Sequence, residues 1–298
     1  MRTAFIEQLV HEATLHADIF LLVGDLGYSV VEPFAQQFPD RYLNVGIAEQ
    51  NMTGIAVGLA QEGYNVFTYS IGNFPTLRCM EQIRYDVCYH EANVKVVAVG
   101  GGYAYGPLGV SHHTTEELGM LRTIPNLNVM APADPLEARQ ITTMLCKTAG
   151  PGYLRLGKAG EPMVHPAGTV VEWGRFVPVL DGAGTLVLST GAMLKYCYDT
   201  ITANKSGFGL VSVPFIKPLD MNALAKLAGQ YDRIITIEEH QRSGGFGSAI
   251  LEGLHDLHEQ GYVTDIPVVK RVAIPDRFIG VAGTQQYLRE MAGLTIEP

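Results

Sequence analysis

The sequence has 298 residues, of which 47% are hydrophobic and 17% charged, and its formal net charge is −9. This length predicts two domains of about 150 residues each, and the composition excludes a disordered chain. The acidic balance, without any cluster of Lys and Arg, excludes a typical nucleic-acid binder.

The amino-terminal stretch carries Glu7, His11 and Glu12 where a signal peptide would need an unbroken apolar run. No later segment reaches the length of a membrane span. The four cysteines are widely spaced and form no CxxC pair: Cys79, Cys88, Cys146 and Cys197. They resemble buried thiols of a reduced compartment, so we expect a cytoplasmic protein without membrane attachment.

Short β-branched runs in the first half alternate with amphipathic stretches of helical period. The predicted strands are residues 19–23, 66–69, 94–99 and 127–130. Such alternation is typical of a mostly parallel sheet that is covered by helices.

The alternation stops between residues 157 and 182, where prolines and glycines interrupt both periods. It resumes with predicted strands at residues 186–189, 210–213, 234–238 and 268–272. The sequence therefore predicts an α/β protein with a first domain at 1–165, a linker at 166–182 and a second domain at 183–298. Each domain should hold a mostly parallel sheet flanked by helices.

The usual nucleotide and hydrolase motifs GxxxxGK[ST], HExxH and GxSxG do not occur. Gly244, Gly245 and Gly247 follow a predicted strand and precede a helix, which is a place where backbone NH groups can bind phosphate. The full GxGxxG pattern is absent, so a close turn between strand and helix is the favoured interpretation.

The most informative stretch is NVGIAEQNM at residues 44–52, which leads into an almost entirely apolar helix. Gly54 and Gly58 lie four residues apart and share a helix face, which would let another backbone approach closely at a subunit interface. Glu49 beside such a surface would be removed from water and suited to share a proton. A helix cap favoured by the dipole explains Glu49 equally well on physical grounds.

The stretch NVGIAEQNM resembles the signature of the pyrimidine-binding domain of transketolases. The likeness continues through EQIR at 81–84, SHH at 111–113 and LRTIPN at 121–126. In the second half, EEH at 238–240, GGFG at 244–247 and PDRF at 275–278 resemble the carboxy-terminal domain of the same family. The resemblance implies a thiamine-diphosphate pyrimidine-binding fold followed by a transketolase C-terminal-like domain.

The resemblance also implies a cofactor site. The glutamate that matches Glu49 hydrogen-bonds the aminopyrimidine ring of thiamine diphosphate and promotes the imino tautomer that removes the thiazolium proton. Phe74 stands where the family places an aromatic ring against the pyrimidine, although an ordinary core phenylalanine is the alternative. Ile71 and Leu77 occupy neighbouring pocket positions that are often aromatic in transketolases, and Asp25 follows the first strand near the cofactor interface.

Substrate contacts follow from the same resemblance. His112 matches an active-site histidine that contacts donor hydroxyls and moves protons, and His113 is a second substrate contact or a residue that orients the loop. Arg155 aligns with an arginine that grips a substrate phosphate, with a surface ion pair as the alternative. Leu108 and Gly100 stand at about the positions of an aspartate and a histidine that read sugar hydroxyls, so the ordinary pentose-phosphate reaction is not expected.

The GDG pattern with which the family's other domain binds magnesium and diphosphate is absent. We therefore expect an N-terminal diphosphate-binding subunit to supply Mg²⁺ binding, and an active site formed between subunits of a self-associating heterotetramer. The sequence predicts the C-terminal subunit of a split transketolase of carbohydrate metabolism. This enzyme would transfer a two-carbon ketol unit from a ketose, as a sugar or sugar phosphate, to an aldehyde. The alternatives are the β subunit of a 2-oxo acid dehydrogenase decarboxylase, a deoxyxylulose-phosphate-type synthase, and a non-catalytic scaffold.

Overall fold

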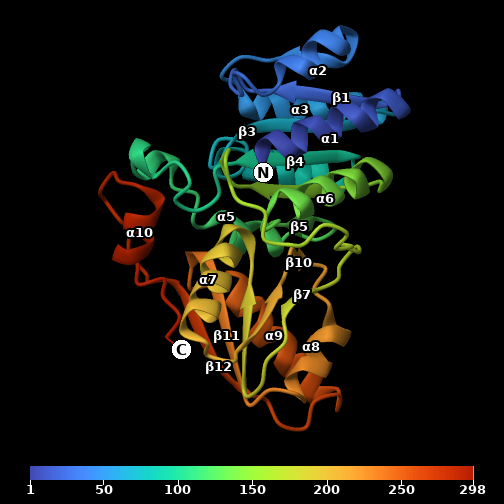
Figure 1. Cartoon of the computed structure of the whole chain (residues 1–298). Helices are drawn as coiled ribbons and strands as arrows, with labels where there is room; N and C mark the ends of the chain where they lie inside the picture. The colour runs from blue at the N-terminus through green and yellow to red at the C-terminus, as the bar shows by residue number, and fades with distance from the viewer. Residues whose placement is uncertain (298) are drawn as a thin grey trace.

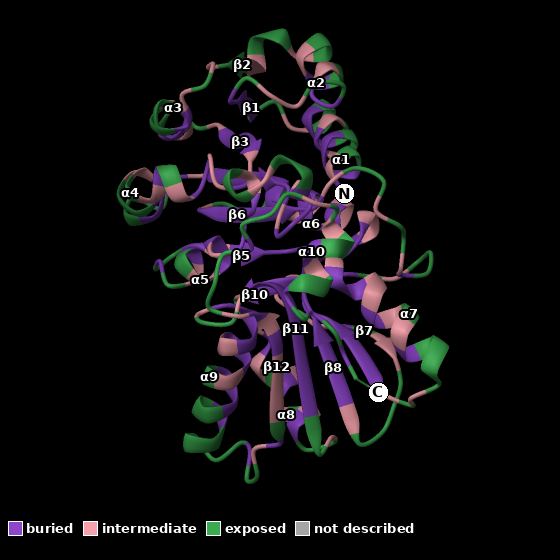
Figure 2. Cartoon of the chain, turned by 90° about the vertical axis from the view of Figure 1, so that its left-hand side faces the viewer, coloured by how far each residue is buried: buried purple, intermediate pink, exposed green. Residues whose placement is uncertain are grey.

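The computed structural model describes residues 1–297 as two sheets, one in each half of the chain, with helices packed on both faces (Figure 1). Both sheets are mostly parallel, which confirms the predicted α/β fold. Figure 2 shows most of the strands as buried, with exposed residues on the outer turns of helices such as α7 (Leu194–Asn204) and α9 (Phe246–Glu259). Of the helices in residues 1–297, none combines the length and the apolar character that a membrane span requires.

The first sheet has seven strands in the order β10-β5-β6-β4-β3-β1-β2. All neighbours are parallel except β10, which runs antiparallel to β5. The strands are β1 (Ile19–Val23), β2 (Tyr42–Asn44), β3 (Asn65–Ile71), β4 (Val94–Val99), β5 (Asn128–Met130), β6 (Gly152–Leu156) and β10 (Phe215–Lys217). The central strands are buried on both faces, which is why β1 is an uninterrupted apolar run and Lys95 is the only charged residue of β4.

Helices close both faces of this sheet. One core cluster joins it to α1 (Arg2–Leu15) and α6 (Pro135–Lys147), and another joins it to α3 (Glu49–Gln61), the π-helix η3 (Ile83–Tyr89) and α5 (Glu117–Arg122). Shorter helical segments in this half are α2 (Glu32–Gln37), η1 (Pro39–Arg41), η2 (Leu77–Cys79), α4 (Met80–Gln82), η4 (Gly106–Leu108) and η5 (Val110–His112).

The second sheet has five strands in the order β12-β11-β8-β9-β7. They are β7 (Val177–Leu180), β8 (Thr185–Ser189), β9 (Gly209–Ser212), β11 (Arg233–Gln241) and β12 (Val268–Ile274). The helical segments of this half are η6 (Gly191–Met193), α7 (Leu194–Asn204), α8 (Met221–Ala228), α9 (Phe246–Glu259) and α10 (Gln285–Met291).

The segment predicted as a linker is partly structured, which corrects its description as a connection alone. Strand β7 lies within it and pairs antiparallel with β9 at the edge of the second sheet. Pro178 made this stretch read as a break, but an edge strand tolerates the missing N–H. The domain boundaries themselves stay a prediction.

The two halves of the chain share a β-sheet and a hydrophobic core cluster. Strand β10 leaves the second half and pairs with β5, so that Phe215 lies opposite Met130 in the first sheet. One core cluster also runs without a break from residues of β5 and β6 to residues of β8 and α9. All four cysteines are free and buried, as predicted.

Candidate active site

Glu49 is the first residue of α3, and its side chain is only 1% exposed. No side chain caps the amino end of α3 at Ala48. The Glu49 carboxylate instead faces the strands: Oε2 lies 2.7 Å from Nη1 of Arg78, and Oε1 accepts a 3.4 Å hydrogen bond from the Ser70 hydroxyl. A side chain at Gly24 would stand 3.3 Å from Cγ of Glu49, so the end of β1 also packs closely on it. The carboxylate is therefore a buried group with a specific partner.

Arg78 joins Glu49 to the other predicted residues, and the sequence analysis did not find it. Its guanidinium lies 4.9 Å from the centroid of the Phe74 ring, while its side chain is 46% exposed. The Phe74 ring in turn meets the His112 ring edge-on, with centroids 5.4 Å apart. Three predicted residues thus lie in one continuous group with Arg78. An arginine inside the mostly apolar stretch of residues 74–80 was a signal of a buried acidic partner.

Ile71 and Leu77 are half-buried and lie at the end of β3 and the start of η2. Leu77 lines a cavity of about 110 Å³ together with residues of the loop after β4. Asp25 follows β1 at the carboxyl edge of the sheet, as predicted. It is exposed there, and its N–H donates to Oδ1 of Asn44 at 3.1 Å while Nδ2 of Asn44 donates back at 3.0 Å. These residues stand around the same edge as Glu49.

The two adjacent histidines have different surroundings. His112 is half-buried, and its Nδ1 lies 3.0 Å from the Ser111 hydroxyl. His113 is buried, with its ring edge-on to Tyr103 at 5.0 Å, and its carbonyl accepts a 2.7 Å hydrogen bond from Asn73. Burial lowers the pKa of His113. His112 is therefore the accessible imidazole, and His113 fixes the loop.

Leu108 and Gly100 occupy the loop that follows β4. The Leu108 side chain is 57% exposed, so within this chain it is available for contact from outside. Gly100 has φ of 96° and donates its N–H to the carbonyl of Leu156 at 2.8 Å. A side chain there would also collide with the ring of Tyr105. The loop conformation thus requires glycine at position 100, and a histidine could not be accommodated.

Arg155 does not present its guanidinium to a substrate phosphate, which corrects the prediction from the resemblance. The residue is 5% exposed, and its Nε lies 2.8 Å from Oε1 of Glu117, which is fully buried. Its Nη2 donates to the carbonyls of Thr114 at 2.6 Å and Glu239 at 2.9 Å. Burial raises the pKa of Glu117 against the opposing effect of Arg155. The alternative prediction, a surface ion pair of Arg155, is wrong as well, because the Arg155–Glu117 pair is buried.

The glycine turn after β11 is not a phosphate site. The carboxylate of Glu238 accepts the N–H groups of Phe246 at 2.6 Å and Gly247 at 2.7 Å at the amino end of α9. A side chain at Gly245 would collide with the same carboxylate. An internal anion thus fills the place that a phosphate would take, and the close turn is confirmed.

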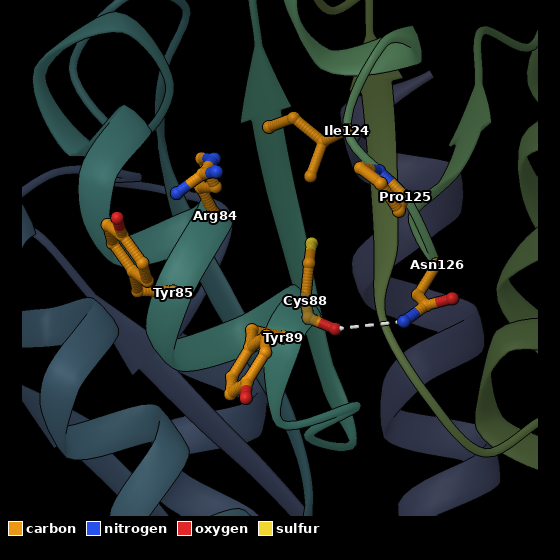
Figure 3. Close-up of a pocket in the computed structure, with 7 residues that line it drawn as sticks. All are labelled: Arg84, Tyr85, Cys88, Tyr89, Ile124, Pro125 and Asn126. Carbon is orange, nitrogen blue, oxygen red and sulfur yellow. Dashed lines mark hydrogen bonds between the residues drawn. The ribbon is translucent and has the colours of Figure 1, made fainter.

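Two surface features lie apart from this group. A side chain built at Gly54 or Gly58 on α3 would meet no atom within 4 Å, so this face is open within the chain, and its use as an interface stays a prediction. A cavity of about 230 Å³ opens beside η3 (Figure 3), lined by Arg84, Tyr85, Cys88, Tyr89, Ile124, Pro125 and Asn126. None of the predicted site residues lines it.

Comparison with known proteins identifies the class to which this fold and site belong. Residues 1–160 match the pyrimidine-binding domain of transketolase, and residues 174–297 match the transketolase C-terminal domain. The chain belongs to the transketolase family, whose members are thiamine-diphosphate-dependent transferases.

Its relatives include single subunits of about the same length. One of the subunits of the apulose-4-phosphate transketolase of Phocaeicola vulgatus is 33% identical, with 92% of this chain and 87% of that protein covered. The 6-deoxy-6-sulfo-D-fructose transketolase subunit SqwH of a Clostridium species is 30% identical, with 99% of this chain and 90% of that protein covered. A solved structure described as a split gene transketolase, inactive β4 tetramer, superposes with a TM-score of 0.85 at 32% identity, covering 99% of this chain and 93% of that one.

The chain is thus a transketolase-like enzyme subunit that depends on thiamine diphosphate. Its residues fit that cofactor, because the buried Glu49 carboxylate leaves Oε1 with only the long contact from Ser70 and can accept a stronger hydrogen bond. The half-buried Phe74 ring adds an aromatic surface beside it.

Proposed function

We propose that this chain is the C-terminal subunit of a split transketolase that transfers a two-carbon ketol unit from a ketose to an aldehyde acceptor. Its active site would be shared with a separate subunit that binds Mg²⁺ and the cofactor's diphosphate. The observation that carries the proposal is the buried Glu49 carboxylate in one group with Phe74 and His112. Retention of this group also argues against a scaffold that only binds its partner.

In this proposal, thiamine diphosphate supplies the nucleophilic carbon that cleaves and forms the carbon–carbon bond beside a carbonyl. Glu49 holds a proton at the pyrimidine ring, and Arg78 keeps that carboxylate oriented from 2.7 Å. Phe74, Ile71 and Leu77 exclude water from the ring. His112 contacts the substrate hydroxyls and moves protons there, because its imidazole is accessible while that of His113 is buried.

The proposed assembly is supported by the relatives as well as by the surface of this chain. The Phocaeicola vulgatus relative is named as one subunit of its enzyme, and the solved split-gene protein forms an inactive β4 tetramer. We propose a heterotetramer with two copies of this chain and two of the diphosphate-binding subunit. The open glycine face of α3 would be its self-association surface.

The substrates are proposed to be a ketose or ketose phosphate together with an aldehyde other than the usual sugar acceptor. Leu108 lacks the hydrogen-bonding oxygen of the aspartate it replaces, and the backbone at Gly100 does not admit a histidine. The relatives named above act on apulose 4-phosphate in one case and on a sulfonated fructose in the other. The loop residues support an aldehyde acceptor other than the usual sugar, and the names of the relatives support an unusual ketose as the donor.

The test is reconstitution. We expect the chain alone to bind thiamine diphosphate weakly and to show no ketol transfer, and we expect both properties to appear when a GDG-containing diphosphate-binding subunit and Mg²⁺ are added. Calorimetry with thiamine diphosphate and an assay for aldehyde release check this for the chain alone and for the reconstituted complex. Robust turnover by the isolated chain would contradict the shared site.

A further inference from the structure

A buried carboxylate of the second sheet reaches into the loop that carries the proposed substrate contacts. Glu239 lies near the carboxyl end of β11 and is 4% exposed. Its Oε1 accepts the backbone N–H of Tyr103 at 2.8 Å. Tyr103 belongs to the loop between β4 and α5, so a residue of the C-terminal half holds a loop of the N-terminal half.

The same carboxylate is also held from the other side by α10. Nη2 of Arg289 lies 2.6 Å from Oε2, and Nε2 of Gln285 lies 3.1 and 3.2 Å from the two oxygens. Both carboxylate oxygens therefore have donors, and the donors come from two separate parts of the chain. This arrangement fixes the carboxylate in place and makes it a rigid support.

The base of the loop rests on this support. Gly102 and Thr114 exchange backbone hydrogen bonds of 2.7 and 2.9 Å, which closes residues 102–114 into one loop. Gly102 has φ of 64°, and a side chain there would collide with the Glu239 carboxylate. Nη2 of Arg155 then links the carbonyls of Thr114 and Glu239. Both ends of the loop are thus tied to residue 239.

The closed loop carries Leu108 and His112, which are the proposed substrate contacts, and the buried His113 that fixes it. The segment that leads into α10 also touches it directly, because Gly283 donates its N–H to the carbonyl of Gly106 at 3.2 Å. A side chain at Gly106 would collide with Leu288 of α10. Figure 1 shows α10, in red, beside the green loop that follows β4. A shift of the Glu239 carboxylate would therefore move the loop, although Glu239 itself makes no direct contact with Glu49.

We propose that Glu239 is a positioning residue for substrate in the ketol transfer, and that the C-terminal half sets substrate affinity through the Glu239 support of residues 102–114. This rests on the proposed function. The Glu49–Arg78 ion pair and the Glu239 contacts with the loop base share no residue, and the loop reaches that pair through the ring contact of His112 with Phe74. Activation of the cofactor should therefore depend on Glu239 far less than substrate affinity does. The two effects can be measured apart.

The experiment compares Glu239→Ala and Glu239→Gln with a matched control, Glu238→Gln, in the complex with the diphosphate-binding subunit. Glu238 is the adjacent buried carboxylate, but its partners are the N–H groups that begin α9. We expect Glu239→Ala to raise KM for the ketose roughly tenfold or more, as the loss of a hydrogen bond to a charged group does, with proton exchange at the thiazolium carbon unchanged. Glu239→Gln should recover part of the affinity because its amide oxygen can still accept the Tyr103 N–H.

A second measurement tests whether Glu239 supports the loop and does not depend on enzyme turnover. Backbone hydrogen exchange of residues 102–114 in the chain should accelerate in Glu239→Ala, or in Glu239→Gln if the alanine variant does not fold, and stay at the wild-type rate in Glu238→Gln. Equal KM and equal loop exchange in the Glu239 and Glu238 variants would overturn the proposal. If the wild-type complex shows no ketol transfer, the proposed function fails, whereas the exchange rates still decide whether Glu239 supports the loop.

Discussion

Replacing Glu49 by glutamine separates a catalytic carboxylate from a structural one. The substitution keeps the shape and the contact with Ser70 but removes the charge that Arg78 meets at 2.7 Å. The Arg78 side chain is 46% exposed, so solvent screening limits the stability lost with this ion pair to about 1 kcal/mol. The rate should change far more, because losing a general acid-base group slows proton transfer roughly 10² to 10⁴-fold.

The assay is proton exchange at the thiazolium carbon of the cofactor in the reconstituted complex, read together with the free energy of unfolding of the chain. Glu117→Gln is the matched control, because Glu117 is also a buried acid beside an arginine, at 2.8 Å, but lies outside the proposed cofactor pocket. Breaking that fully buried pair should cost about 3–5 kcal/mol and leave exchange intact in the folded fraction. If Glu49→Gln unfolds more easily while exchange stays at the wild-type rate, Glu49 is structural and the catalytic assignment is wrong.

Three further predictions address specificity, assembly and pH. Leu108→Asp should cost little stability, because the Leu108 side chain is 57% exposed. It should raise the kcat/KM for glycolaldehyde relative to that for acetaldehyde roughly tenfold. A strong wild-type preference for glycolaldehyde that the mutation leaves unchanged would show that another residue recognises the hydroxyl. Gly58→Leu should block self-association in sedimentation experiments while the helix content is kept, since the chain itself leaves that position open, and an intact oligomer would refute the interface. His165 lies 2.7 Å from Glu137 with both side chains buried; burial disfavours its charge, but the hydrogen bond and charge of Glu137 outweigh this and raise the pKa of His165. Its stabilising contribution is therefore complete below the unfolded pKa of about 6.5 and is lost as the pH rises through the raised folded pKa. Denaturation should show that His165→Gln costs about 1–3 kcal/mol at pH 5.5 and less at pH 9, and an equal cost at both values would contradict the charged pair.

The sequence predicted the parts of the fold that depend on local pattern. Helix α3 begins at Glu49, and the mainly apolar runs at residues 19–23 and 94–99 are β1 and β4, because such runs are typical of central parallel strands. Strand β6 was missed because its five residues include Gly152 and Arg155, which leave no apolar run of strand length. Strand β10 was missed because three residues that cross to another sheet carry no period of their own.

For the candidate site as well, the local sequence pattern predicted individual residues but not the contacts between residues far apart in the chain. A helix-initiating acid before an open glycine face could be recognised in the sequence, but its pairing with Arg78 depends on how β3 and η2 fold back over α3. Arg155 was assigned to a phosphate because its position matched a family pattern. Its partners, Glu117 of α5 and Glu239 of β11, are far away in the chain, and only the tertiary fold brings them to it.

One group of buried charges lies where the two halves of the chain meet, and it affects how the halves unfold. Arg155 of the first sheet pairs with Glu117 and donates to the carbonyl of Glu239, while Glu239 accepts from the loop after β4. Separating the halves would remove the Glu239 carbonyl from Arg155 and the Tyr103 N–H from the Glu239 carboxylate, and each hydrogen bond lost to a charged group costs about 1.5–3 kcal/mol. It would also withdraw β10 from β5 and open the core cluster that both halves share. The substrate loop is thus built on a junction that neither half can form alone, so the two halves should unfold together and the C-terminal half should influence substrate affinity although it lies outside the cofactor pocket.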